Sequence, residues 1–130
     1  MPLATVGGMT DLRSTHDPLQ TLARQLQQCA DVRDWGPFHA PKNLASALTV
    51  EAGELLEHFQ WLTEDQSRQL TPNQKQAVAH EMADVLLYLV QLSTALDINL
   101  VDAAQAKMAL NAQKYPVEQA RGHSRKYDAL

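Results

Sequence analysis

Two pairs of acidic residues are the side chains of this sequence best suited to chemistry. Glu51 and Glu54 form one pair, and Glu81 and Asp84 form the other. Residues three apart are neighbours on a helix surface, so each pair places two carboxylates side by side if its segment is helical. Carboxylates that converge between two helices repel one another unless a positive charge lies among them. Because oxygen ligands favour hard cations, we expect this charge to be Mg²⁺, with Mn²⁺ able to replace it.

The alternative is that lysine or arginine neutralises these acids, since buried charges are normally paired. The two acid-bearing segments and their flanks supply few such cations, and all of them lie near predicted helix ends: Lys42, Arg68 and Lys75. This shortage favours a bound metal ion. Two nearby histidines do not form the Glu-x-x-His pairs of di-iron bundles, so we expect His58 to pack in the interior and His80 to lie on a helix surface.

Gly53 lies between the two glutamates, where glycine costs a helix about 1 kcal/mol relative to alanine. One interpretation is that the helix simply tolerates this cost. The functional interpretation is that another backbone or a ligand approaches closely beside the acids.

The elements that position these acids are predicted to be helices. Apolar residues recur with the helical period, and Glu51 itself occupies one position of an apolar stripe. Asp17-Pro18-Leu19-Gln20 and Thr71-Pro72-Asn73-Gln74 each combine a capping side chain, a proline and a glutamine, which is typical of a helix start. No segment shows strand alternation, and short connections favour an all-α fold, an antiparallel four-helix bundle. The predicted helices span residues 18–33, 41–62, 72–96 and 100–115, with a polar loop at 63–70.

Length and composition set broad limits. The 130 residues predict one helical domain at 17–116, between a loose arm at 1–16 and a tail at 117–130. The net charge of −4 offers no basic surface to a nucleic acid polymer. The longest apolar run, 85–90, is far shorter than the roughly 20 residues of a membrane span, and no secretory signal is evident. The single cysteine, Cys29, fits a reducing compartment, so we expect a cytoplasmic protein with no membrane partner.

Several segments beyond the acids make the sequence recognisable. Together they resemble the MazG-like superfamily of all-α nucleoside triphosphate pyrophosphohydrolases, and within it the dCTP pyrophosphatase branch. The segments are Trp35-Gly-Pro-Phe38-His39-Ala-Pro41-Lys42-Asn43, Phe59-Gln60-Trp61, Glu81-Met-Ala-Asp84-Val-Leu-Leu-Tyr88 and Lys107-Met-x-x-Asn111-x-x-Lys114-Tyr115.

The resemblance implies hydrolysis between the α and β phosphates of a nucleoside triphosphate, with Mg²⁺ essential. It assigns the metal to the positions of Glu51, Glu54, Glu81 and Asp84. It also implies that Trp35, Phe38, His39, Trp61 and Tyr88 line the nucleotide pocket. A homodimer or homotetramer with shared active sites is expected on the same basis.

The residue types allow finer roles. Glu54 is the candidate general base for the attacking water. Trp35 and Trp61 offer flat faces for a base, although packing in a core or an interface is as common a role for tryptophan. The remaining polar candidates are His39 and Asn43 for base or sugar, Lys42, Lys107 and Lys114 for phosphates or simply solvated surface, and Asn111 for substrate.

The substrate stays open at this point. dCTP or a 5-modified dCTP is the leading hypothesis, and dUTP, other deoxynucleotides and phosphoribosyl-ATP are alternatives. A non-catalytic nucleotide-binding bundle is a further alternative. Leu26 stands where the vertebrate dCTP enzymes have histidine, which removes one polar contact to the nucleotide if the alignment holds.

Overall fold

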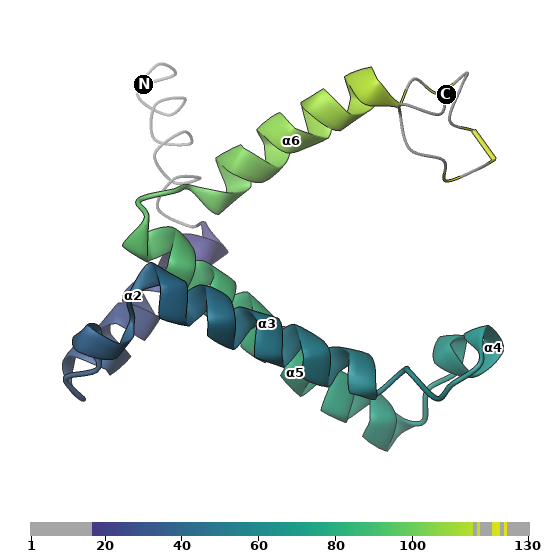
Figure 1. Ribbon diagram of the computed structural model, residues 1–130, viewed down its shortest axis with the longest axis horizontal. Helices are drawn as coiled ribbons and strands as arrows, with labels where there is room; N and C mark the ends of the chain where they lie inside the picture. The colour runs from purple at the N-terminus through teal and green to yellow at the C-terminus, as the bar shows by residue number, and fades with distance from the viewer. Residues whose placement is uncertain (1–16, 116, 118–120, 123, 125–130) are drawn as a thin grey trace, which may run out of the picture. The chain divides into compact units, whose positions relative to one another are not determined.

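The computed structural model describes residues 17–115, 117, 121–122 and 124. All the regular structure in these residues is helical, and no strand occurs among them, so the predicted all-α class is confirmed (Figure 1). No single helix of this part of the chain is both long enough and apolar enough to cross a bilayer. The elements are α2 (Pro18–Asp31), a 3-10 turn η1 (Gly36–Phe38), α3 (Pro41–Glu57), α4 (Glu64–Arg68), α5 (Pro72–Ala95) and α6 (Leu100–Lys114).

The helix starts follow local capping chemistry, as the sequence predicts. The Asp17 side chain accepts a hydrogen bond of 3.0 Å from the Leu19 amide at the start of α2. At the start of α5, Thr71 and Gln74 form a reciprocal capping box with bonds of 2.9 and 3.2 Å. Side chains that satisfy the free amides of a first turn are worth about 1 kcal/mol each. These caps therefore fix where α2 and α5 begin, whereas α3 begins at Pro41 without a side-chain cap.

The region after α3 differs from the prediction. The helix ends at Glu57 and not near Leu62, because the amides of His58 and Phe59 turn to carbonyls three residues back. Such bonds tighten the last turn of a helix and end it. The predicted loop at 63–70 contains a further short helix, α4, which begins with a capping box formed by Thr63 and Gln66.

The chain divides into two units, one up to Asp97 and one from Ile98 onwards. In the first unit, α3 and α5 lie side by side and antiparallel, and α2 also packs on α5 (Figure 1). The buried apolar residues in the described part of this unit are few: Ala30, Leu44, Val78 and Val90. The second unit contains α6. The domain limits expected from the sequence, 17–116, stay a prediction, and the arm at 1–16 and most of the tail lie outside the described residues.

Candidate functional site

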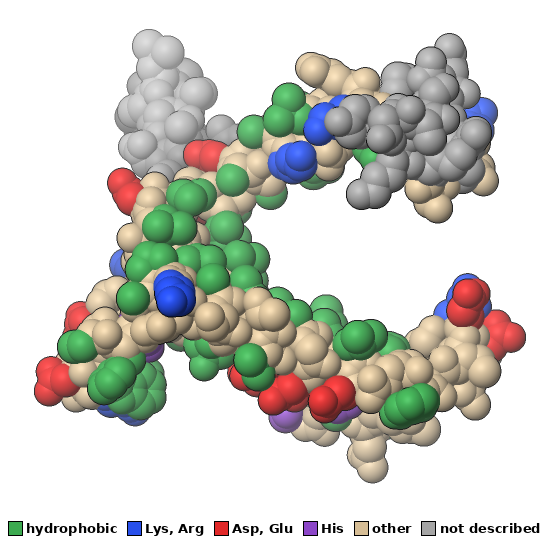
Figure 2. Space-filling model, viewed as in Figure 1, with side chains coloured by type: hydrophobic (Ala, Val, Ile, Leu, Met, Phe, Trp, Pro, Cys, Tyr) green, Lys and Arg blue, Asp and Glu red, His purple; other side chains and the backbone are tan. Residues whose placement is uncertain are grey.

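The two acid pairs meet between α3 and α5. Glu51 and Glu54 lie on α3, and Glu81 and Asp84 lie on α5. One carboxylate oxygen each of Glu51, Glu81 and Asp84 can be chosen so that all three lie within 4.8 Å of one another. Acidic side chains gather along the α3–α5 pair in Figure 2, with histidine beside them. The antiparallel packing of two helices therefore brings together acids that are 30 residues apart in sequence, counting from Glu51 to Glu81.

Glu54 belongs to the same group through its contact with Glu51. The pKa of Glu51 is raised from 4.5 to about 7, first by burial, then by hydrogen bonding to Glu54 and Glu81, and then by the charges of Glu54 and Asp84. Two carboxyl groups can share a hydrogen bond only when one of them carries a proton. In the absence of a cation, this cluster therefore holds a proton at a pH where an ordinary glutamate has lost it.

Two carboxylate oxygens in the cluster are buried and lack a hydrogen-bond partner, Oε2 of Glu51 and Oε2 of Glu81. This agrees with the raised pKa, because ionised carboxylates face each other without a donor between them. Buried acceptors left unpaired are costly, so a partner is required when the cluster ionises. The oxygen donor set and the short separations fit a divalent cation of the Mg²⁺ type.

Neutralisation by lysine or arginine, the alternative interpretation, is not seen. Among the described residues, the only basic side chain in ion-pair range of the four acids is His58, whose Nε2 lies 4.0 Å from Glu81 Oε1. Arg68 pairs instead with its near neighbours Glu64 and Asp65 on α4.

His58, which we expect to serve for packing, is half-buried and also lies near the acids. It caps the end of α3 and lies beside Glu81 of α5. The spacing contained a signal for this placement, because His58 follows Glu54 by four residues and Glu51 by seven, which is one helix face.

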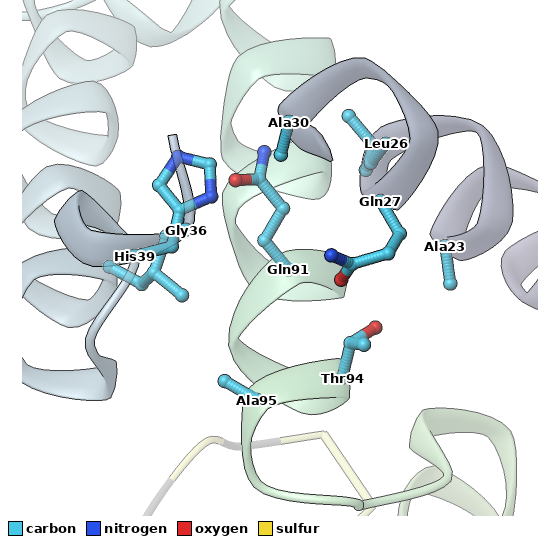
Figure 3. A pocket seen from close by; sticks show the side chains of 10 residues that line it. Ala23, Leu26, Gln27, Ala30, Gly36, His39, Gln91, Thr94 and Ala95 are labelled. Atoms are coloured by element: carbon cyan, nitrogen blue, oxygen red, sulfur yellow. The ribbon is translucent and has the colours of Figure 1, made fainter. Parts of the chain in front are cut away.

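A cavity of about 200 Å³ lies in the same unit, between α2, η1, α3 and α5 (Figure 3). Its wall includes Leu26 and Gln27 of α2, His39, Leu44 of α3 and Gln91 of α5. Gln91 Oε1 is buried and lacks a hydrogen-bond partner. Leu26 thus lines the cavity as an apolar residue, and glutamines supply polar groups there. Sequence reasoning missed both glutamines, because glutamine is ordinarily a surface residue.

Three of the predicted pocket residues lie around η1. The Trp35 and His39 rings meet edge to face at 6.3 Å, and the Arg33 guanidinium lies 5.4 Å from the Trp35 ring centre. Asn43 donates a hydrogen bond of 3.4 Å to the Phe38 carbonyl and so ties η1 to the start of α3. His39 reaches the cavity, whereas the Phe38 side chain is 69% exposed.

The other predicted residues are more widely spread. Tyr88 is half-buried on α5, on the face that carries Glu81, and Lys42 is exposed in the first turn of α3. Trp61 is 87% exposed in the turn after α3, at the opposite end of that helix from Trp35. The last three belong to the second unit and share one face of α6: Lys107, Asn111 and Lys114.

Comparison with known proteins gives consistent results. A model of the MazG-like family matches residues 47–130. The dCTP pyrophosphatase 1 proteins of Homo sapiens and Mus musculus are each 40% identical over 119 residues, which cover 90% of this chain and 70% of theirs. A crystal structure of a pyrophosphatase from Archaeoglobus fulgidus is similar with a TM-score of 0.73 and 39% identity, over 78% of this chain and 94% of that one.

Proposed function

This chain belongs to the MazG-like family, in its dCTP pyrophosphatase branch, and from that premise we propose that it hydrolyses dCTP or a 5-modified dCTP with Mg²⁺ as cofactor. As a nucleoside triphosphate pyrophosphohydrolase it breaks the bond between the α and β phosphates and releases a monophosphate and pyrophosphate. Such an activity fits the removal of surplus or non-standard nucleotides. With its one cysteine, Cys29, free and exposed, we place the protein in the cytoplasm.

The observation that carries the proposal is the acid cluster with its two unpaired buried oxygens. Glu51, Glu54, Glu81 and Asp84 would hold the metal. Bound there, Mg²⁺ would supply positive charge that offsets the negative charge of a triphosphate.

The residues of the chain have two further tasks at this end of the substrate. One is to accept the proton of the attacking water, which we assign to Glu54 as general base. The other is to contact the phosphate oxygens, for which we propose Lys42 and, from α6, Lys107, Asn111 and Lys114. His58 Nε2 lies 4.0 Å from Glu81 Oε1, close enough for an ion pair when the imidazole is protonated.

The nucleoside end of the substrate would occupy the cavity at η1. His39 lines it, and Trp35 stands against the His39 ring with about half of its surface open to solvent. Phe38 and Asn43 complete this end, because the Asn43 hydrogen bond holds η1 in place. Tyr88 lies on the α5 face between the acids and Gln91, where the sugar of a bound nucleotide would pass.

A second copy of the chain completes the proposed pocket. Trp35 and Trp61 flank opposite ends of α3, whose 17 residues span about 25 Å, so the two rings of one chain cannot enclose one base. Helix α5 also exposes an apolar stripe, Met82, Leu86 and Leu89, at helical spacing. Exposed apolar stripes of this kind mark interfaces in soluble proteins. We therefore propose a homodimer or homotetramer in which Trp61 serves the site of a neighbouring chain.

The test is a steady-state comparison of dCTP, 5-methyl-dCTP, dUTP and dATP, with pyrophosphate as the measured product. We expect release of pyrophosphate from dCTP or 5-methyl-dCTP with Mg²⁺ and none with excess EDTA. A preference for dUTP or dATP would replace the proposed substrate and leave the reaction in place. If no triphosphate released pyrophosphate, the non-catalytic alternative would hold, although the complete set of four acids argues against it.

A further inference from the structure

The cavity between α2 and α5 contains two amide side chains that the proposed reaction does not yet use. Gln91 projects from α5 and Gln27 from α2, and both extend into the same space (Figure 3). The oxygen of Gln91 is buried without a hydrogen-bond donor. The nitrogen of Gln27 donates to Asp31 Oδ1 at 2.9 Å, which leaves its oxygen as the free end of the amide. The two amide oxygens are therefore acceptors that no donor among the described residues occupies.

The cavity also lies in register with the acid cluster. Gln91 follows Asp84 by seven residues on α5, and Leu44 precedes Glu51 by seven residues on α3. Seven residues are two helical turns, so both residues stay on the face of their helix that carries the acids, about 10.5 Å along the axis. Antiparallel helices place these two displacements at the same end. A nucleotide whose phosphates lie at the acids therefore extends its base towards Gln91.

From this arrangement we propose that the oxygens of Gln27 and Gln91 form an acceptor pair that selects a base with an exocyclic amino group. The proposal rests on the function proposed above. In a pyrimidine nucleotide the 4-position lies across the ring from the sugar, so its substituent enters the cavity first. Cytosine carries an amino group there, with two N–H donors for two acceptors, whereas uracil and thymine carry an oxygen acceptor.

The terminal torsion of glutamine is broad and roughly two-fold, so Gln91 can turn its oxygen to a ligand at little cost. In doing so, the oxygen exchanges an unpaired state for a hydrogen bond. The plain alternative is that an ordered water fills this role in a cavity of this size. The two interpretations differ in one measurable respect, because a glutamine that only binds water does not discriminate between bases.

The experiment measures kcat/KM for dCTP and for dUTP in the wild-type protein and in the variants Gln91→Met and Gln27→Met. Methionine keeps the length of the side chain and removes both amide groups. We expect each variant to lower the ratio of the two kcat/KM values by about three- to tenfold, as expected for one lost hydrogen bond. Matched controls on exposed faces of the same helices, Gln28→Met and Gln76→Met, should leave the ratio unchanged.

Binding of dCMP and dUMP, measured by calorimetry, separates this inference from the proposed reaction. Tighter binding of dCMP than of dUMP, reduced in Gln91→Met, supports the acceptor pair even if no triphosphate is hydrolysed. An active enzyme whose dCTP-to-dUTP ratio is the same in wild type and in both variants overturns it. Wild-type enzyme with no preference for the amino base also overturns it, while the pyrophosphohydrolase activity stands.

Discussion

Glu51 is the acid whose pKa is raised by the burial and the negative charge of the site. Its carboxyl group keeps a proton up to a pH of about 7 in the folded chain, whereas an ordinary glutamate loses it near 4.5. Between these values the folded state binds more protons than the unfolded state. The contribution of Glu51 to the free energy of unfolding is therefore fully present below pH 4.5 and is lost as the pH rises through 7.

We expect the metal-free Glu51→Gln variant to escape this loss. Its free energy of unfolding should increase relative to wild type as the pH is raised from 4.5 to 7, because the amide has no proton to lose. Urea unfolding in EDTA at several pH values measures the difference. Added Mg²⁺ should reverse the comparison, since the cation takes the place of the proton in the wild-type cluster. Parallel pH profiles for the two proteins would contradict the raised pKa.

Two further substitutions separate metal binding from proton transfer. Asp84→Asn should reduce turnover through weaker metal binding, so excess Mg²⁺ should restore part of it. Glu54→Gln should reduce kcat by about 10²–10⁴-fold even at saturating Mg²⁺ if Glu54 is the general base as well as a metal ligand. Steady-state kinetics across a Mg²⁺ titration provide the measurement. Glu57→Gln, at an exposed position of α3, is the control and should remain active.

Among the helices, α3 carries one residue that weakens it. Nothing lies within 4 Å of the place where a Cβ would stand at Gly53, so the described structure offers no steric reason for glycine. We expect Gly53→Ala to raise the free energy of unfolding by about 0.5–1 kcal/mol, and Ala52→Gly to lower it by a similar amount. Chemical denaturation of both variants tests this. If Gly53→Ala instead destabilised the protein or abolished activity, a neighbouring chain or the substrate would have to approach α3 there.

The success of sequence reasoning also varied along these helices. The starts at Asp17 and Thr71 were predictable because a cap is a local interaction between neighbouring residues. The end of α3 was not, because Phe59 and Leu62 continue the apolar period through a turn that breaks the helix. Periodicity records which side chains are apolar and does not record where backbone hydrogen bonds change partner.

The candidate site shows the same division. Spacing predicted that the acids of each pair are neighbours on one helix face, because residues at i and i+3 lie side by side there, and the meeting of the two pairs depends on the packing of α3 against α5. The roles of His58 and Gln91 depend on what the facing helices bring to them, and this information is not local in the sequence. The second tryptophan, Trp61, lies on the surface of the single chain and stays a predicted site residue.

On the scale of the whole molecule, a small core and a large exposed apolar surface point to association. Few apolar residues in the described part are fully buried, whereas Met82, Leu86 and Leu89 of α5 are open to solvent. We expect the wild-type protein to sediment as a dimer or a larger species. Leu86→Glu, which places a charge in the centre of this stripe, should shift it towards the monomer and reduce activity.

Sedimentation velocity and activity, measured at the same protein concentration, test this expectation. Gln76→Glu introduces the same charge at an exposed position of α5 outside the stripe and should change neither. A wild-type monomer with full activity would show that one chain is sufficient and would remove the need for a shared pocket.

The two-turn interval between the acids and the cavity sets a fixed distance between a phosphate site and a base site on the α3–α5 pair. Inorganic triphosphate can occupy only the acid cluster, and a free nucleoside can occupy only the cavity. A nucleotide, which carries a base and phosphates at the separation set by one sugar, can occupy both sites at once. Inserting a single residue between Asp84 and Gln91 would rotate Gln91 by about 100° around the helix axis relative to Asp84. The length of this helix segment therefore determines which ligands can occupy both sites, even when every side chain is kept.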